Sequence, residues 1–240
     1  VNAFGKRINQ IDFKEGNKGK TINLTIDTEI QKLTSELLRD KAGSISIMDI
    51  YTGEIIAMNS SPSFDPNLFL YGIDNNLWSQ IQKDPLKPLV NKTLSGLYSP
   101  GSTIKPIVAL SALENDVIRA NMRVECKGKV EMYDQKYHCW KKKGHGVMSL
   151  KNAIKQSCDI YFYELARLLG VDRLNLTAEK FGLGKQVLGQ YFLNEKKGIV
   201  PSTKWKKEKL GQNWYLGETF ITGIGQGYIQ TNPLQLCLMT

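Results

Sequence analysis

The sequence has 240 residues and a formal net charge of +9, with 23% charged and 9% aromatic residues. This balance is typical of a globular protein and excludes a disordered chain, and no apolar run approaches the roughly 18 residues of a membrane span. Lysines concentrate at 141–143 and 196–209, which raises nucleic acid or an anionic membrane surface as a partner. Because no RRM or helix-turn-helix pattern accompanies them, we interpret these lysines as a solvated face and expect no nucleic-acid partner.

The first residues of the chain carry little structural signal. Residues 1–20 are polar and contain glycines, so we expect a linker or the end of a preceding domain, with residues 21–240 forming the domain that follows. The alternation of Ile22, Leu24 and Ile26 predicts a short, half-buried strand.

A helix and a hairpin are predicted next. Asp27 or Thr28 can cap the helix, and Gly43 is predicted to end it. The helix is amphipathic, with apolar residues at helical spacing: Ile30, Leu33, Leu37 and Leu38. Residues 45–47 and 54–58 then flank a turn at 51–53, which predicts a β-hairpin.

The helix that begins at Ser102 differs from the first one. Residues 107–113 are apolar on every side of its axis, so it should run through the middle of the domain. A short helix capped by Ser149 and a longer helix that ends at Gly170 follow it, with residues 157–159 at the break between them. Two strands, several helices and one central buried helix indicate an α+β domain.

Ser102 and Lys105 stand one helical turn apart and form a candidate catalytic pair. A serine hydroxyl needs a base within hydrogen-bond reach, and burial in apolar surroundings lowers the pKa of a lysine so that it can be that base. The positive end of the helix would favour an oxyanion on the attacked carbonyl. In the alternative interpretation, Ser102 only caps the helix and Lys105 extends to solvent.

Cysteine and histidine residues form a second candidate site. Cys126, Cys139, His145 and Cys158 offer four ligands suited to tetrahedral zinc, with His138 as a possible substitute. Four protein ligands would make this zinc structural. The alternatives are a disulfide between Cys126 and Cys139, with Cys158 in an apolar helix face. The fourth cysteine, Cys237, is interpreted as a core residue.

Several segments of the chain occur together and in the order known from one family. They are GKTI (19–22), TID (25–27), TGEIIAM (52–58), SPSFDPN (61–67), YSPGSTIKP (98–106), WKK (140–142), GHG (144–146), SCD (157–159), IGQGYIQ (224–230) and NPLQL (232–236). With these segments, nearly the whole chain resembles the transpeptidase domain of class B penicillin-binding proteins, most closely the elongation-type penicillin-binding protein 2. The resemblance implies the transpeptidase fold shared with serine β-lactamases, an antiparallel sheet flanked by helices with a helical subdomain. Residues 21–240 would be its N-terminal and central part.

The resemblance also implies a peptidoglycan D,D-transpeptidase activity in cell elongation. Ser102 would be acylated by a D-Ala-D-Ala stem peptide or by a β-lactam, Lys105 would take its proton, and Ser157 would relay a proton to the leaving amine. His145 and Cys158 match metal-ligand positions of some relatives. The implied partner is a SEDS-family glycosyltransferase of the bacterial inner membrane. The protein itself would have its catalytic domain in the periplasm and a membrane anchor outside this chain.

Two features depart from the family pattern. The second motif reads S-C-D, so Asp159 stands where an amide is common, which favours the elongation type over the division type. The resemblance leaves two roles open for Asp159 in the catalytic site, contact with the substrate or orientation of Lys105. No K-T-G or K-S-G triad follows Ser157, so the expectation is that this strand, and with it a complete active site, requires residues beyond Thr240. Other interpretations are a serine β-lactamase, a β-lactam sensor, and a zinc-stabilised binding module without enzyme activity.

Overall fold

The predicted hairpin is present in the computed structural model, which describes residues 16–70, 72–132 and 135–240. Strands β1 (Gly43–Met48) and β2 (Ile55–Ser61) pair antiparallel, with Gly43 opposite Ser61. The carboxylate of Asp49 accepts hydrogen bonds from the N–H groups of Tyr51 and Thr52, both at 2.8 Å, and closes the turn. Gly53 completes the turn at φ 74°, a conformation that favours glycine.

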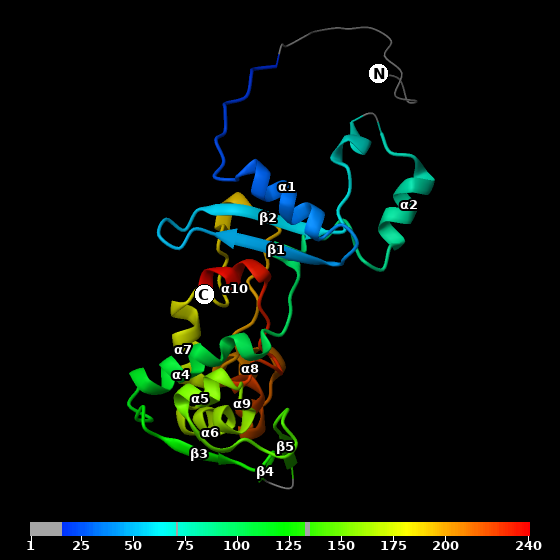
Figure 1. Cartoon of the computed structure of the whole chain (residues 1–240). Coiled ribbons are helices and arrows are strands. Elements are labelled where there is room, and N and C mark those ends of the chain that lie inside the picture. Colours follow the sequence, from blue (N-terminus) through cyan, green and yellow to red (C-terminus); the bar gives the residue numbers. More distant parts are fainter. Residues whose placement is uncertain (1–15, 71, 133–134) are drawn as a thin grey trace.

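Two helices cover the two faces of this hairpin. Helix α1 (Thr28–Leu37) packs on β2, and α10 (Pro233–Met239), near the other end of the sequence, packs on β1 from the opposite side (Figure 1). Asp27 caps α1 as predicted, because its carboxylate accepts from the N–H groups of Glu29 and Ile30 at 2.9 Å. The helix ends at Leu37 rather than at Gly43, which instead begins β1.

The strand predicted at residues 22–26 is wrong. This segment has no strand partner among the described residues, and Ile22 and Leu24 are 80% and 76% exposed. Alternation makes a strand only where a sheet edge accepts its backbone hydrogen bonds, and here the nearest such bond is from Asp27 N–H to the carbonyl of Ile56. Leu33 and Leu37 of α1 are also exposed, although they belong to the apolar residues at helical spacing. Residues 1–15 of the predicted linker lie outside the described residues.

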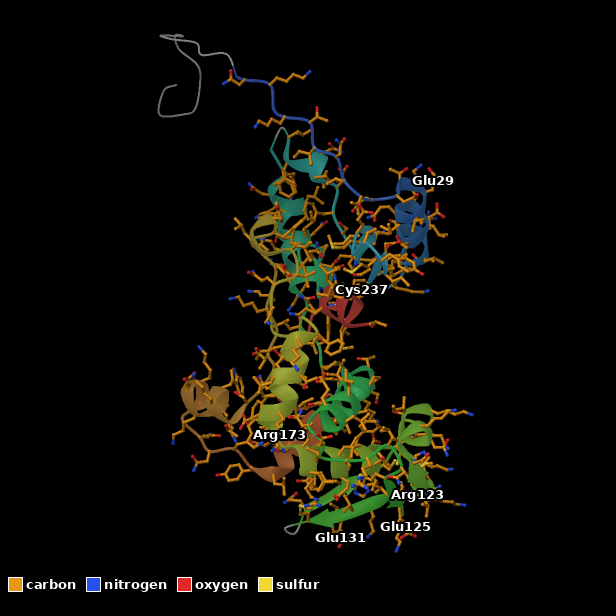
Figure 2. All side chains as sticks on the ribbon, turned by 90° about the vertical axis from the view of Figure 1, so that its left-hand side faces the viewer. Glu29, Arg123, Glu125, Glu131, Arg173 and Cys237 are labelled. Carbon is orange, nitrogen blue, oxygen red and sulfur yellow. The ribbon has the colours of Figure 1, made fainter. Side chains whose placement is uncertain are left out.

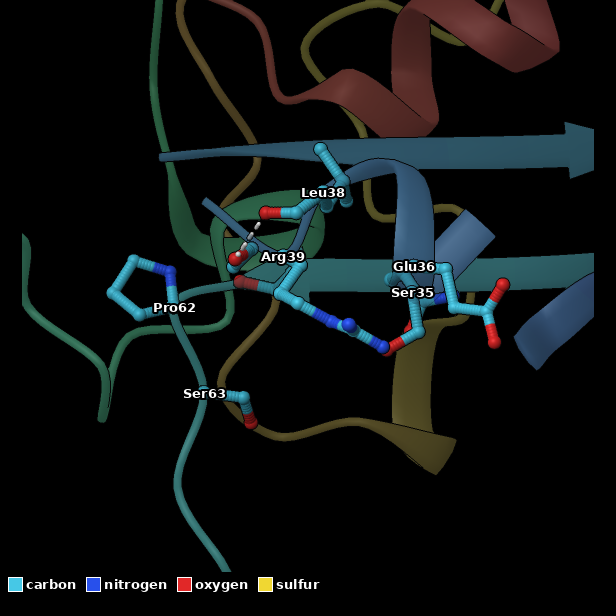
Figure 3. Close-up of a pocket in the computed structure, with 9 residues that line it drawn as sticks. Ser35, Glu36, Leu38, Arg39, Pro62 and Ser63 are labelled. Carbon is cyan, nitrogen blue, oxygen red and sulfur yellow. Dashed lines mark hydrogen bonds between the residues drawn. The ribbon is translucent and has the colours of Figure 1, made fainter. Parts of the chain in front are cut away.

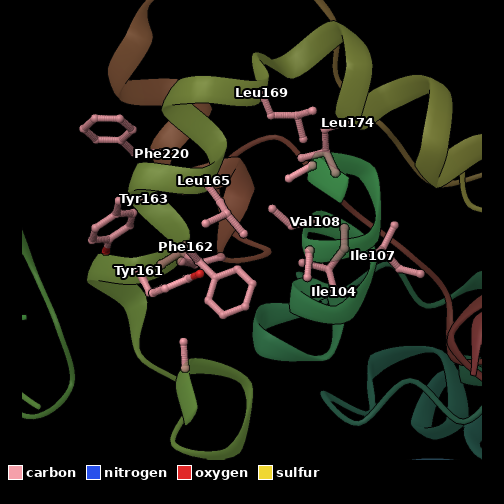
Figure 4. Close-up of a cluster of buried hydrophobic side chains, with 14 of the residues drawn as sticks. Ile104, Ile107, Val108, Tyr161, Phe162, Tyr163, Leu165, Leu169, Leu174 and Phe220 are labelled. Carbon is pink, nitrogen blue, oxygen red and sulfur yellow. The ribbon is translucent and has the colours of Figure 1, made fainter. Parts of the chain in front are cut away.

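The predicted central helix is confirmed. A 3₁₀ turn, η2 (Gly101–Ile104), leads into α4 (Lys105–Glu114), which packs against α6 (Asp159–Leu169) and α7 (Val171–Lys180). Figure 4 shows Ile104 and Val108 on the side of α4 that faces Phe162 and Leu165, and all four side chains are fully buried. This packing holds the first residues of α4 rigidly in the interior.

The remaining elements complete the region around these helices. They are η1 (Pro66–Phe69), α2 (Asn75–Lys83), α3 (Lys92–Ser95), β3 (Arg123–Cys126), β4 (Lys129–Met132), β5 (Gln135–His138), β6 (Gly146–Ser149), α5 (Leu150–Lys155), η3 (Gly189–Tyr191), α8 (Thr203–Leu210) and α9 (Leu216–Gly223). The α+β class is therefore confirmed, as is the short helix α5, whose cap Ser149 accepts from Asn152 N–H. The antiparallel pairs β3–β6 and β4–β5 were not predicted. No described helix has the length and apolar character to cross a bilayer.

A buried lysine ties α8 to α9. Lys206 is 1% exposed, and its ammonium pairs with the carboxylate of Glu218. Three aromatic rings surround the same ammonium, those of Tyr215, Tyr228 and Trp214, with centroids at 4.7, 5.7 and 5.9 Å. The rings and the carboxylate together compensate for the loss of hydration of the charge.

Substitution of Lys206 by methionine is expected to lower the free energy of unfolding by about 3–5 kcal/mol, because Glu218 loses its partner. Urea denaturation of the purified protein measures this change. The matched control is Lys204→Met on the same helix, where the side chain is 82% exposed and the expected change is below about 0.5 kcal/mol. Equal stabilities of the two variants would contradict the prediction.

Candidate active site and metal centre

The structure brings Ser102, Lys105, Ser157 and Asp159 together in one hydrogen-bonded chain. Lys105 Nζ donates to Ser157 Oγ at 2.8 Å, to the carbonyl oxygen of Ser157 at 3.0 Å and to Asp159 Oδ1 at 2.6 Å. Ser157 Oγ in turn donates to Ser102 Oγ at 3.1 Å. A proton can therefore move between Ser102 and Lys105 through a single hydroxyl.

The surroundings of Lys105 differ from the prediction in one respect. Lys105 is 2% exposed, which excludes the alternative in which it extends to solvent. Its ammonium is not in purely apolar surroundings, however, because all three of its donors meet oxygen atoms, with the Phe162 ring 5.5 Å away. Among the described hydrogen bonds none joins Lys105 directly to Ser102, so Ser157 is the link between them.

Local backbone conformation explains how the second motif reaches the first. Ser157 lies between α5 and α6 at φ 49°, a left-handed conformation that is rare for residues other than glycine. Cys158 follows as the fully buried N-cap of α6, and Asp159 begins that helix. The tight break places the Ser157 hydroxyl and the Asp159 carboxylate on the same side, toward Lys105.

Gly225 supports the turn that carries Ser102. It adopts φ 76°, and a Cβ at this position would lie 1.9 Å from the carbonyl oxygen of Gly101. The N–H of Gly101 donates to the carbonyl of Gly225 at 2.8 Å. Sequence reasoning did not assign this residue a role, although its GQG segment was the signal for it.

Ser102 opens onto a cavity of about 460 Å³ whose wall includes Ser157, Asp159, Trp140, Tyr163 and Gln226. Trp140 and Gln226 belong to the segments that carry the family resemblance, but the sequence did not predict them as residues of the site. A separate cavity of about 310 Å³ lies between the end of α1 and the end of β2, where Figure 3 shows Ser35, Arg39 and Ser63 around it. Its lining holds no nucleophile paired with a base, so we place the candidate active site at Ser102.

Cys126, Cys139, His145 and Cys158 form a compact cluster beside this cavity. Their four ligand atoms all lie within 4.8 Å of one another, and His145 Nδ1 is 3.5 Å from the sulfurs of both Cys126 and Cys139. Bonds of about 2.3 Å from a tetrahedral zinc ion to sulfur separate ligand atoms by roughly 3.8 Å, so the donor set fits such an ion. The cluster can hold a metal.

The structure does not contain the disulfide or the substitute ligand that the sequence left open as alternatives. All four cysteines are free, so Cys126 and Cys139 form no disulfide. His138 is not part of the cluster. Cys237 is half-buried on α10 beside the hairpin, far from the part of β3 that carries Arg123 and Glu125 (Figure 2).

Burial controls the protonation of the cluster. It raises the pKa of the Cys158 thiol to about 12 and also raises the pKa of Cys139. Burial likewise lowers the pKa of His145, which favours the neutral imidazole that binds metals. The thiols would ionise when a bound cation stabilises their thiolates.

Comparison with known proteins places this site in a family. The family model described as the penicillin binding protein transpeptidase domain matches residues 43–240. The chain belongs to the penicillin-binding protein transpeptidase family. Ser102, Lys105 and Ser157 all lie within the matched range.

Relatives identify the type within this family as PBP2/MrdA. The chain is 37% identical over 238 residues to the peptidoglycan D,D-transpeptidase MrdA of Escherichia coli K12, covering 98% of this chain and 37% of that protein. It superposes on Pseudomonas aeruginosa PBP2, solved in complex with WCK 5153, with a TM-score of 0.86 and 43% identity, covering 90% of this chain and 50% of that one. Helicobacter pylori PBP2, solved in complex with MreC, gives a TM-score of 0.87 and 35% identity over 98% of this chain and 44% of that one.

The transpeptidase fold expected from the sequence is thereby confirmed. The chain spans 37% of the length of the E. coli relative, so it corresponds to part of such a protein. It is a homologue of peptidoglycan D,D-transpeptidases of the PBP2/MrdA type.

Proposed function

We propose that the protein is a peptidoglycan D,D-transpeptidase that works through an acyl-enzyme on Ser102. The observation that carries the proposal is the hydrogen-bonded chain from Lys105 through Ser157 to Ser102 at the mouth of a cavity. Serine becomes nucleophilic when a base is within reach, and here the base is reached through one hydroxyl.

In the proposed acylation, Ser102 Oγ attacks the carbonyl between the two terminal D-Ala residues of a stem peptide. The proton of Ser102 passes through Ser157 Oγ toward Lys105, which accepts it in its neutral form. The C–N bond then breaks, the terminal D-Ala leaves, and the same hydroxyl returns a proton to its amine. An amine from a second stem peptide attacks the ester, forms the crosslink and releases Ser102. Asp159 holds Lys105 in place throughout.

The same chemistry would make the protein a β-lactam target, since a β-lactam carbonyl acylates the serine in place of the peptide. The 240 residues contain no K-T-G triad after Ser157, and we propose that the whole protein supplies this strand as a wall of the site.

We further propose that the Cys₃His cluster binds zinc in a structural role. Four protein ligands leave no open position for a water molecule, so the ion would supply no catalytic chemistry. Cys158 lies between Ser157 and Asp159 in the chain, so a metal bound there would hold the second motif in place.

The cellular context is proposed from the family. A PBP2-type protein acts in cell elongation, anchored in the bacterial inner membrane with its catalytic domain in the periplasm. A SEDS-family glycosyltransferase is the proposed partner, and a protein like MreC is a second candidate because the H. pylori relative was solved with MreC.

Labelling of the full-length protein with a fluorescent penicillin tests this function. We expect a covalent, long-lived adduct on the wild type and none on Ser102→Ala, with Ser99→Ala as a control that labels normally. Equal labelling of wild type and Ser102→Ala would reject the acyl-enzyme and favour a binding module without enzyme activity. Rapid turnover of the adduct would favour the alternative function, a serine β-lactamase, over a transpeptidase or a β-lactam sensor.

A further inference from the structure

Trp140 occupies an unusual position for a large aromatic residue. It is 64% exposed, so burial of its ring contributes little to its location. Its polar edge nevertheless points into the protein, because Nε1 donates to the carbonyl oxygens of Gln156 and Ser157, both at 3.1 Å. A hydrogen bond rather than apolar packing therefore fixes the indole.

The main chain of Trp140 contacts the other half of the second motif. Its N–H donates to Asp159 Oδ2 at 3.0 Å, while Asp159 Oδ1 accepts from Lys105. Its ring meets the His145 ring edge-on at a centroid distance of 5.3 Å, which limits rotation of the side chain. Trp140 thus contacts two of the three groups that bind the ammonium of Lys105, the Ser157 carbonyl and the Asp159 carboxylate.

The hydrogen bond from Trp140 to the carbonyl of Ser157 indicates most clearly what Trp140 does. Ser157 has a left-handed backbone conformation, which persists only where the surroundings hold it. Two donors hold its carbonyl, Lys105 Nζ at 3.0 Å and Trp140 Nε1 at 3.1 Å. If Lys105 shifts as protons move during the reaction, the indole is the donor that remains on this oxygen.

We propose that Trp140 is a positioning residue for the acylation step. Its indole N–H keeps the Ser157 peptide in the orientation that places Ser157 Oγ between Lys105 and Ser102. This role rests on the proposed acyl-enzyme function and adds to it a residue that acts through Ser157 rather than on the substrate. Loss of the N–H slows the transfer of the proton while the cavity wall keeps its shape.

The test compares three residues at position 140 of the full-length protein: tryptophan, phenylalanine, and β-(3-benzothienyl)alanine, in which sulfur replaces the indole N–H at nearly the same size. Stopped-flow labelling with a fluorescent penicillin separates the acylation rate constant k2 from the dissociation constant Ks. Both replacements are expected to lower k2 roughly tenfold, the effect of one lost hydrogen bond in the transition state, and to change Ks less than about twofold. The melting temperature and the metal content should stay at the wild-type values.

The controls make each outcome decisive. Trp78→Phe on α2, whose ring packs against Phe69, should leave k2 unchanged. A benzothienyl variant with the k2 of wild type would overturn the inference, as would a lowered melting temperature with unchanged k2. Ser102→Ala is measured in parallel. If this variant is still labelled, the proposed function fails and the inference with it. If it is not labelled and the variants at position 140 keep the k2 of wild type, only the inference is rejected.

Discussion

Replacement of Lys105 by methionine is expected to lower the second-order rate constant of acylation by a β-lactam by about 10³-fold. This is within the range of about 10²–10⁴ that a positioned acid or base contributes. The reason is geometric, because Lys105 Nζ is 2.8 Å from Ser157 Oγ, which is itself 3.1 Å from Ser102 Oγ. Stopped-flow labelling of the full-length protein with a fluorescent penicillin measures the constant.

A second variant distinguishes the loss of the proton acceptor at position 105 from the loss of its positive charge. Lys105→Met also leaves Asp159 without its cation, so part of its effect could come from a disturbed site. Lys105→Arg keeps a positive charge beside Asp159 but cannot release its proton, so it should be nearly as slow. Lys155→Met, at the exposed end of α5, should react as the wild type does. Normal acylation by Lys105→Arg would contradict the role of Lys105 as a base.

Removal of the zinc ion that we propose for the Cys₃His cluster is expected to destabilise the protein and to slow acylation without any change at Ser102. Structural zinc contributes an apparent binding free energy of about 10–16 kcal/mol in small zinc domains, so its loss from the Cys₃His cluster should lower the melting temperature clearly. Cys158→Ser removes one ligand next to Ser157, and we expect it to lower both the zinc content and k2. Metal analysis, thermal unfolding and penicillin labelling measure the three quantities.

Cys237→Ser is the matched control for this experiment, because its sulfur lies near the carbonyl of Ser46 in β1 and outside the cluster. It should keep its metal, its melting temperature and its reactivity. Metal-free protein that is acylated at the normal rate would contradict the structural role of the cluster. Wild-type protein that contains no zinc after purification without a chelator would contradict zinc binding itself.

Prediction from the sequence succeeded where the signal was local. The cap at Asp27, the hairpin turn at 51–53 and the all-apolar helix after Lys105 each depend on residues within a few positions of one another. The helix break at Ser157 was recognised for the same reason. The predicted strand at Ile22–Ile26 failed because alternation describes one chain, whereas a strand requires a partner.

The candidate site was predictable in its parts and not in its arrangement. Ser102 and Lys105 are one turn apart, and this spacing together with the family resemblance predicted them as a catalytic pair. The position of Ser157 between them, 55 residues from Ser102, could not be inferred from spacing. The apolar residues of its own helix gave no indication that Lys105 meets oxygen atoms, and only the family resemblance raised Asp159 as a residue that orients it.

Local chemistry in the chain, together with the family resemblance, thus indicated the candidate nucleophile, the lysine beside it, the candidate metal ligands and the helix that follows Lys105. The pairing of β3 with β6 and the placement of Trp140 on Ser157 came from tertiary packing. Strands of four residues carry too little periodic signal to define a partner or a register. A hydrogen bond between residues distant in sequence forms only when the whole fold brings donor and acceptor within about 3 Å, a condition that no short segment contains.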